Sequence, residues 1–219
     1  MNTASNIYYD YQLKYIFIGD SGVGKSMLVL RYTDNKFYNE HKATLGVDFG
    51  YKLLTVNNHL FNIRMWDTAG SEAFKSVTRS FYKNSTCAVI VYDITKRNTF
   101  EHIDEWIKDA VKLCPEKVKL VLIGNKVDLK ENRKVSYEEG KSKAEENGMI
   151  FYETSAKTGE NINEFMNESV KEIARDIDNN VYDLDEEGEA CGITKGVNNM
   201  KAIMLDGERT DEGDKKCKC

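Results

Sequence analysis

GDSGVGKS, at residues 19–26, is the stretch of sequence that decides the fold of this chain. It matches the P-loop pattern, in which a glycine-rich turn joins a buried strand to a helix. An apolar run at residues 13–18 precedes it, and an amphipathic segment follows it to residue 32. Backbone N–H groups in such a turn, together with the helix N-terminus, attract phosphate oxygens. The stretch therefore predicts a nucleotide-phosphate site.

Two side chains of this motif have expected roles of their own. Lys25 can reach the β- and γ-phosphates, and the hydroxyl of Ser26 can coordinate Mg²⁺. The other residues expected to surround the nucleotide are Ser21, Gly22, Val23, Gly24 and Met27. A chance match to a glycine-rich turn is the alternative, and the flanking strand and helix patterns argue against it.

The composition is that of a globular domain with an acidic extension. The 219 residues are 41% apolar and 31% charged, which is typical of a soluble protein. Residues 178–219 hold eleven acidic and six basic side chains, so the net charge of −5 lies there. Because no basic face is indicated, we expect no nucleic-acid partner. No run of 18 apolar residues occurs, so no membrane span is expected.

The cysteines and the N-terminus indicate a reduced, cytosolic protein. Five cysteines do not suggest a disulfide framework, and Cys87 and Cys114 lie in apolar surroundings typical of a core. Residues 1–10 form an expected flexible extension without a secretion signal or an N-terminal glycine for myristoylation.

Hydrophobic periodicity from residue 11 to residue 177 alternates between strand and helix. Strands are predicted near residues 13–18, 47–53, 61–65, 86–92, 118–123 and 149–153, and Asn57-Asn58 predicts a hairpin turn between the second and third. The pattern predicts a three-layer α/β fold with a six-stranded, mostly parallel sheet flanked by helices.

Three helix starts are predicted from capping pairs, in which an Asn or Ser precedes a Glu by three residues. The pairs are Asn98 with Glu101, Ser136 with Glu139, and Asn161 with Glu164. After residue 177 the periodicity stops, and residues 178–219 are predicted to be a flexible tail. The apolar piece at residues 202–205 could dock, but a solvated tail is favoured.

Two later motifs select the base. Asp128, in NKVD at residues 125–128, can accept both adjacent donors of guanine, a pair that adenine lacks. SAK, at residues 155–157, could offer backbone N–H groups to the guanine carbonyl. Each motif is weak alone, but together they favour guanine. The expected base-binding residues are Asn125, Lys126, Asp128, Ser155, Ala156 and Lys157.

DTAG, at residues 67–70, ends the second hairpin strand. Asp67 can hold Mg²⁺ directly or through water, and the N–H of Gly70 can contact the γ-phosphate. Thr44 is placed to complete the Mg²⁺ shell, and Phe37 could cover the guanine edge. By spacing alone, an ordinary loop threonine and a packed aromatic residue remain the simpler interpretation of these last two.

Together these motifs resemble the Rab family of small GTPases in the Ras superfamily. The resemblance covers residues 11–177 and rests on GDSGVGKS, TLGVDFG (44–50), WDTAGSE (66–72), FKSVTRSFYKNS (74–85), VYDITKRNTF (91–100), GNKVD (124–128) and ETSAK (153–157). The ending Cys217-Lys218-Cys219 is similar to the C-x-C ending of that family.

The resemblance implies a P-loop G domain that acts as a switch in vesicle traffic. GTP with Mg²⁺ would order two loops, near residues 36–46 and 68–82, and effectors would bind them until hydrolysis to GDP. Phe49, Trp66 and Phe81 would face effectors, although core packing is an almost equal interpretation of Trp66. The resemblance further implies an exchange factor, a GTPase-activating protein, a prenylation escort, a GDP-dissociation inhibitor and a monomeric chain.

One departure from the family concerns catalysis. The family usually has Gln after DTAG to orient the attacking water, and this chain has Ser71, which is too short. With Gly70 and Thr44 as the other catalytic candidates, we expect slow unaided hydrolysis. A neutral substitution at residue 71 is the alternative.

By the same resemblance, Cys217 and Cys219 would carry two geranylgeranyl groups; stray thiols are the alternative. Each buried CH₂ contributes about 0.8 kcal/mol, and stable attachment needs two chains. The expected location is the cytoplasmic face of a vesicle, Golgi or endosomal membrane, with a cytosolic pool bound to the inhibitor.

Two other functions remain open from the sequence. Ser71 would suit a scaffold that stays bound to GTP, and a P-loop also occurs in metabolic kinases, for which no lid or acceptor motif is present. GTP turnover with an activating protein would separate the first from a cycling GTPase, and a phosphate-acceptor assay would test the second.

Overall fold

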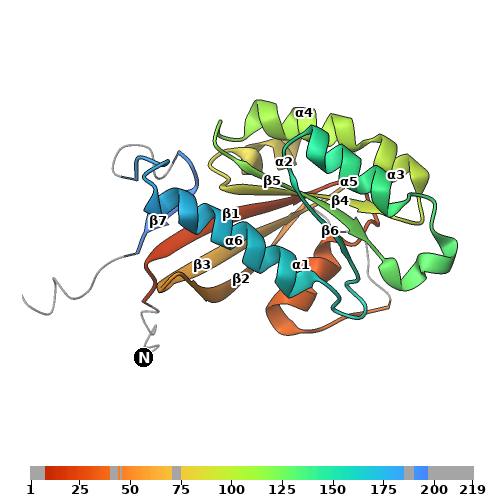
Figure 1. Ribbon diagram of the computed structural model, residues 1–219, viewed down its shortest axis with the longest axis horizontal. Coiled ribbons are helices and arrows are strands. Elements are labelled where there is room, and N and C mark those ends of the chain that lie inside the picture. The colour runs from red at the N-terminus through yellow and green to blue at the C-terminus, as the bar shows by residue number, and fades with distance from the viewer. Residues whose placement is uncertain (1–7, 40–43, 45, 71–74, 185–189, 197–219) are drawn as a thin grey trace, which may run out of the picture.

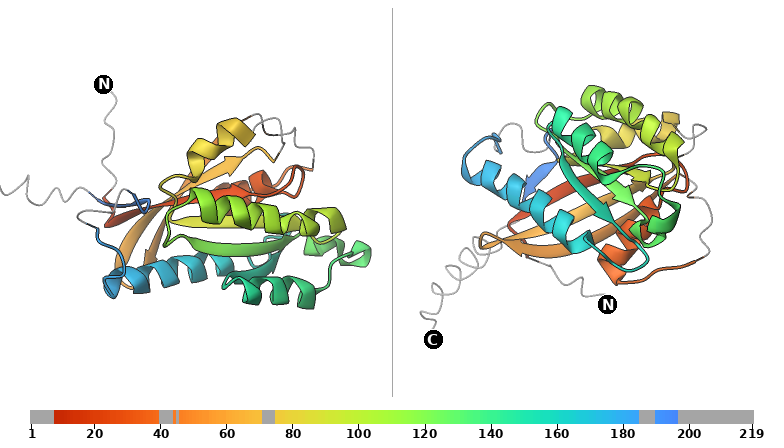
Figure 2. Two further views of the ribbon diagram at one scale, coloured as in Figure 1. Left: turned by 90° about the horizontal axis from the view of Figure 1, so that it is seen from above. Right: turned by 45° about the vertical axis from the view of Figure 1, so that its right-hand side comes forward.

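The computed structural model describes residues 8–39, 44, 46–70, 75–184 and 190–196, with the side chains of residues 75–77 excepted. These residues form a single twisted sheet with helices on both faces (Figures 1 and 2). In chain order the elements are β1 (Tyr11–Ile18), α1 (Lys25–Asp34), β2 (Val47–Val56), β3 (His59–Thr68), α2 (Lys75–Tyr82), β4 (Cys87–Asp93), α3 (Arg97–Glu101), α4 (Ile103–Leu113), β5 (Lys119–Asn125), the 3₁₀ segment η2 (Val127–Asn132), α5 (Tyr137–Glu146), β6 (Ile150–Thr154), α6 (Ile162–Asp178) and β7 (Ile193–Lys195).

The six predicted strands are present in the order β2-β3-β1-β4-β5-β6. Only β2 runs antiparallel to its neighbour on this path, because it forms a hairpin with β3. Asn57 and Asn58 form the hairpin turn with φ of 50° and 63°, the positive values that a two-residue type I′ turn requires. The predicted α/β fold with its mostly parallel sheet is therefore confirmed.

Helices cover both faces of the sheet, so the inner strands are buried throughout. Tyr15 and Phe17 of β1 pack in the core beneath α1 and α6, while Ile16 and Ile18 pack on the opposite face with α3, α4 and α5. Burial of successive residues is typical of parallel strands between two helical layers. The carboxyl ends of these strands then form the edge at which ligands bind in such folds.

One of the three predicted helix caps is confirmed. The Ser136 side chain accepts a hydrogen bond from the N–H of Glu139, and the Glu139 carboxylate accepts one from the N–H of Ser136. The cap at Asn98 is wrong, because α3 already begins at Arg97. The helix start at Asn161 is confirmed, since this residue directly precedes α6, but its capping bond is not made: Asn161 has φ of 58°, and its side chain donates to the Glu153 carbonyl. The side-chain amide of Asn161 therefore binds the backbone of β6 and does not cap α6.

The tail prediction requires a correction. Residues 190–196, predicted to belong to a flexible segment, include β7, which pairs antiparallel with β1 through Tyr11–Lys195 and Leu13–Ile193. Ile193 and Cys191 are buried in the core beside Tyr182. The described sheet consequently has a seventh strand, which covers the part of β1 that precedes its pairing with β4. The apolar piece at residues 202–205 and both terminal cysteines lie outside the described residues.

The region predicted as the second switch loop, near residues 68–82, is partly helical. Helix α2 begins at Lys75, and its residues Tyr82 and Phe81 pack on the α4 side of the sheet. The amphipathic pattern of residues 75–82 is typical of a helix, whereas the resemblance alone implied a loop over this range.

Cys87, Cys114 and Cys191, the cysteines of the described residues, form no disulfide with one another and lie inside the fold. Cys87 is fully buried, and burial raises the pKa of the half-buried Cys114 thiol to about 12. Such thiols are unreactive packing residues, as expected for both.

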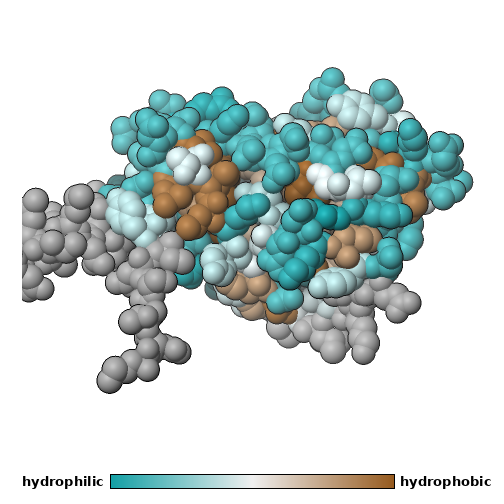
Figure 3. Space-filling view, turned by 90° about the horizontal axis from the view of Figure 1, so that it is seen from below, coloured by the Kyte–Doolittle hydropathy of each residue, from teal (hydrophilic) through white to brown (hydrophobic). Residues whose placement is uncertain are grey.

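The surface seen from below is mostly hydrophilic, with small separate hydrophobic areas (Figure 3). None of the helices within the described residues has the length and apolar character needed to cross a bilayer.

Candidate functional site

The glycine-rich turn lies between β1 and α1, as the sequence predicts. Gly19 has φ of 137°, and a Cβ atom there would lie 2.2 Å from the carbonyl oxygen of Val91 in β4. Gly24 has φ of 103°, and a Cβ atom would lie 2.4 Å from the side-chain nitrogen of Asn125. Both positions thus need glycine for conformation and for space. The turn is held against the ends of two neighbouring strands.

Lys25 begins α1 and is buried beneath this turn. Its ammonium group donates to the carbonyl oxygens of Gly19 and Asp20, at 2.8 and 2.9 Å. Burial lowers the pKa of Lys25 to about 8, although Asp67 and Asp20 counteract this by favouring the charged form. A cation kept in a buried, electrostatically costly position is stabilised when an anion binds next to it. This is the behaviour expected of a phosphate-binding lysine.

Three oxygen-bearing side chains predicted to hold Mg²⁺ are brought together. The hydroxyl oxygens of Ser26 and Thr44 lie 2.8 Å apart, and Thr44 Oγ1 is 3.4 Å from Asp67 Oδ2. Ser26 and Asp67 also line a groove of about 410 Å³ beside the turn. Hydroxyl and carboxylate oxygens are ligands that Mg²⁺ accepts, and it keeps its other positions for water and phosphate. The residues present therefore fit this ion.

Gly70 follows β3 and lies directly on the phosphate loop. A Cβ atom at Gly70 would be 2.4 Å from the carbonyl carbon of Asp20 and 2.5 Å from the carbonyl oxygen of Gly19. The neighbouring Ala69 N–H donates to the carbonyl of Gly46, at 2.8 Å, which joins the ends of both predicted switch loops. Ser71, the next residue, lies outside the described residues.

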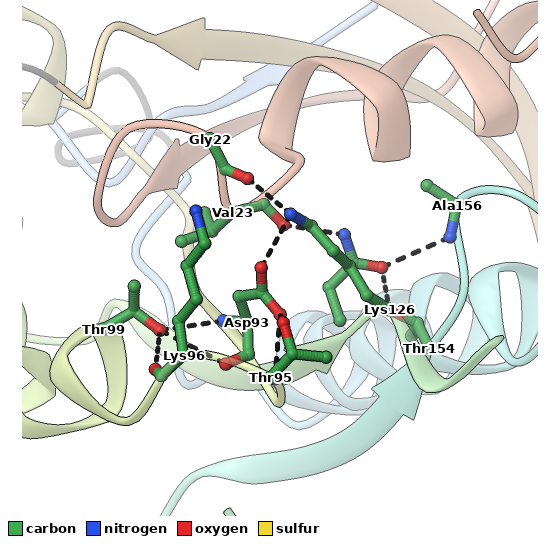
Figure 4. A network of polar contacts seen from close by, with 10 residues as sticks. Gly22, Val23, Asp93, Thr95, Lys96, Thr99, Lys126, Thr154 and Ala156 are labelled. Carbon is green, nitrogen blue, oxygen red and sulfur yellow. Dashed lines mark hydrogen bonds and ion pairs between the residues drawn. The ribbon is translucent and has the colours of Figure 1, made fainter. Parts of the chain in front are cut away.

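Asn125, at the end of β5, connects the phosphate loop, the end of β6 and the SAK loop at the predicted base site, and its partners Val23, Thr154 and Ala156 are labelled in Figure 4. Its amide nitrogen donates to the carbonyl of Val23 at 2.8 Å, while its amide oxygen accepts from the N–H of Ala156 at 3.2 Å and the hydroxyl of Thr154 at 3.3 Å. The side chain is almost completely buried. Asn125 therefore holds the phosphate loop and the SAK loop together, a role that its spacing along the chain does not indicate.

Lys126 reaches back to the phosphate loop in the same network. With φ of 74°, it donates to the carbonyl of Gly22 at 2.7 Å and forms an ion pair of 2.7 Å with Asp93 (Figure 4). Asp93 is fully buried and also accepts hydrogen bonds from the N–H and hydroxyl of Thr95. Asp93 was not among the predicted site residues. An acidic residue at the end of a buried strand was the available signal.

Asp128 is held by a residue from the other base motif. Ser155 Oγ donates to Asp128 Oδ1 at 2.7 Å and accepts from the N–H of Thr158 at 3.1 Å. A serine that both donates and accepts in this way orients the carboxylate. The two weak sequence motifs are thus one structural unit, and recognition of guanine by Asp128 stays a prediction.

Phe37 and Arg31 lie at the other side of this unit. Arg31 donates to the carbonyls of Ala156, at 2.8 Å, and Lys157. Its guanidinium group is also 6.0 Å from the centre of the Phe37 ring. Arg31 was missed at the sequence level because a charged residue on an amphipathic helix normally faces solvent. Here it links α1 to the loop after β6.

A family model described as the Ras family matches residues 14–175, which is more than half of the chain. This chain belongs to the Ras family. Ras-family proteins are small GTPases that switch between GTP and GDP forms and bind these nucleotides with Mg²⁺. The match covers the phosphate loop, the oxygen ligands and both base motifs described above.

The aromatic residues expected to face effectors are adjacent in this Ras-family protein. The ring centre of Trp66 lies 5.0 Å from that of Phe49 and 5.2 Å from that of Phe81. Phe49 is 45% exposed on β2, whereas Trp66 and Phe81 are partly buried. The position of Trp66 is compatible with core packing and with effector contact, since the ring packs against two others and is still partly exposed.

Proposed function

We propose that this Ras-family GTPase is a Rab-type switch that recruits effectors to an intracellular membrane in its GTP form. The observation that supports this most directly is the position of the Phe49, Trp66 and Phe81 rings. They span β2, β3 and α2, the elements next to Thr44 and Gly70, which are predicted to contact Mg²⁺ and the γ-phosphate. Loss of the γ-phosphate would release Thr44 and Gly70, and the backbone next to them carries these three rings.

Attachment to the membrane is proposed to use prenyl groups on Cys217 and Cys219, which lie outside the described residues. The position of β7 affects how far the anchor can reach. A flexible tail of all 41 residues after α6 would have a root-mean-square reach of about 35 Å. Because residues 190–196 lie in the sheet, we propose a flexible tail of residues 197–219 only, whose reach would be roughly 26 Å. The GTPase domain would therefore work close to the bilayer.

The experiment compares the full chain, carrying an N-terminal fluorescent tag, with the Cys217→Ser/Cys219→Ser double variant. We expect the wild type on an internal membrane and the variant in the cytosol, with one GDP or GTP bound per chain in both. Continued membrane residence of the variant would contradict the anchor.

Effector recruitment is tested separately by immobilising the protein loaded with GDP or with a non-hydrolysable GTP analogue. Partners should be retained only by the GTP-analogue form. The Phe49→Ala variant should lose them, whereas Tyr137→Ala, at an equally exposed aromatic residue on α5, should keep them. Equal retention by the GDP form would contradict the switch.

A further inference from the structure

Asp20, the second residue of the phosphate loop, makes two side-chain hydrogen bonds to the helices beside it. Asp20 Oδ2 is 2.7 Å from Nδ1 of His102, and Asp20 Oδ1 accepts from Nε1 of Trp106 at 2.9 Å. His102 lies at the junction of α3 and α4, and Trp106 is in the first turns of α4. The carboxylate therefore points toward α4, and its side chain is only 17% exposed.

The backbone of Asp20 belongs to the phosphate site itself. Its carbonyl oxygen accepts a hydrogen bond from the ammonium group of Lys25, and Gly70 packs directly on its carbonyl carbon. Lys25 and Gly70 are the two groups predicted to contact the β- and γ-phosphates. Any movement of the Asp20 peptide would displace both of them.

A carboxylate at this position has an electrostatic cost, because it repels the phosphates that the loop is built to bind. The hydrogen bonds from His102 and Trp106 reduce this electrostatic cost, because they hold the Asp20 carboxylate toward α4. One donor, the indole of Trp106, is neutral at every pH, and the other is a histidine that can become a cation. A cationic donor makes a stronger hydrogen bond to a carboxylate than a neutral one does.

We propose that Asp20 is a positioning residue of the phosphate site, held by His102 and Trp106, and that protonation of His102 strengthens retention of the bound nucleotide. Since an ionised carboxylate only accepts, Nδ1 of His102 carries a proton in both forms of the ring. Titration then occurs at Nε2, which leaves the geometry intact and changes only the charge beside Asp20.

Charged groups around this histidine act in the same direction. The hydrogen bond and the charge of Asp20 raise the pKa of His102 above its ordinary value, and the charges of Glu105 and Glu101 on its own helices add to this, while desolvation opposes it. Asp20 also lies near a cation, because its charge acts on Lys25 as well as on His102. His102 is half-exposed, so solvent reaches the ring and proton exchange is fast.

The proposal rests on nucleotide binding by the phosphate loop and is independent of a role in membrane traffic. Its test is the dissociation rate of fluorescently labelled GDP from the full-length protein between pH 5.5 and 8.0, at constant excess Mg²⁺. The wild type should release GDP about two- to fivefold faster at pH 8.0 than at pH 5.5, the range expected for one partly exposed charged hydrogen bond.

Three substitutions assign the effect. His102→Gln cannot titrate and should give a flat profile. Trp106→Phe loses a donor at every pH and should release GDP faster throughout while keeping the slope. His59→Gln is the matched control, because His59 pairs with Asp178 at 3.3 Å at the start of β3, and it should keep the wild-type profile.

Persistence of the slope in His102→Gln would overturn the proposal, as would its loss in a His41→Gln variant that changes the third histidine of the chain. A flat wild-type profile in a protein that retains GDP would overturn this proposal alone. Failure to bind GDP at any pH would overturn nucleotide binding with it.

Discussion

The hydroxyl of Thr86 donates a hydrogen bond of 2.7 Å to the carbonyl oxygen of Gly192, joining the start of β4 to the segment after α6. The same carbonyl accepts from the N–H of Lys14 in β1, at 3.1 Å. One peptide from near the end of the chain is thereby held by two neighbouring central strands. This contact lies by the first half of β1, at the opposite end of that strand from the phosphate loop.

Replacing Gly192 by Ala should detach β7. Gly192 has φ of 72°, and a Cβ atom would lie 2.0 Å from the carbonyl oxygen of Asn84, so the backbone must move. We expect a loss of roughly 3 kcal/mol in the free energy of unfolding, measured in urea, and faster trypsin cleavage after Lys195.

Gly148→Ala is the matched control for this substitution. Gly148 has φ of 61°, but a Cβ atom added there would have no other atom within 4 Å. It therefore carries the conformational cost without the collision, about 1 kcal/mol. Equal losses for both variants would show that β7 contributes little to stability.

Nucleotide binding should take up a proton at high pH through Lys25. The pKa of Lys25 is about 8 in the nucleotide-free protein, and phosphate raises it by favouring the charged form. Below pH 8 the group is already protonated, so its contribution to affinity is constant. Above pH 8 the GDP affinity should fall by up to about tenfold per pH unit.

The free energy of unfolding should change with pH in the direction opposite to the GDP affinity. The reason is that Lys25 in the unfolded chain keeps its proton up to its ordinary pKa of 10.5. The cost of burying the charge is therefore complete below pH 8 and is relieved between pH 8 and 10.5. Calorimetry of GDP binding at pH 7.5 and 9.0, in buffers of different ionisation enthalpy, measures the proton uptake. Uptake at pH 9.0 that persists in Lys25→Met would assign it elsewhere.

Asp128→Asn should change which purine is bound. The amide would place a donor against the paired donors of guanine, and we expect GTP affinity to fall at least about 100-fold. Xanthine carries a carbonyl in place of the exocyclic amine, so XTP should bind the variant better than GTP does.

Competition binding against labelled GDP measures both affinities. Asp104→Asn is the control, since Asp104 is an exposed carboxylate that pairs with Lys143 away from the base motifs. Unchanged preference for GTP in Asp128→Asn would remove Asp128 from base recognition.

Ser71→Gln should accelerate unaided GTP hydrolysis. A glutamine can orient the attacking water, whereas serine is too short to reach it, so we expect at least about a tenfold rise in the single-turnover rate. Ser142→Gln, an exposed serine on α5, provides a surface control with the same change of side chain. If Ser71→Gln hydrolyses GTP no faster than the wild type, residue 71 does not limit the reaction.

Local sequence was sufficient for much of this fold. The strands from β1 to β6 were predictable because burial on one face makes apolar residues alternate, and burial on both faces makes them continuous. The phosphate loop and its lysine were predictable because eight adjacent residues carry the whole motif. Ser136 and Glu139 formed the predicted cap for the same reason: a capping pair is a contact between neighbours in the chain.

The sequence by itself determined a Ras-family nucleotide site and the α/β sheet that carries it. Tertiary structure alone decided which side chains brace that site: Lys126 against Asp93, Arg31 against the SAK loop, and Asp20 against His102. It also decided that β7 joins the sheet, since three residues are too few to show a period. These contacts join segments that are far apart in the chain. Only packing brings such segments together, so no local pattern in a single sequence indicates which of them touch.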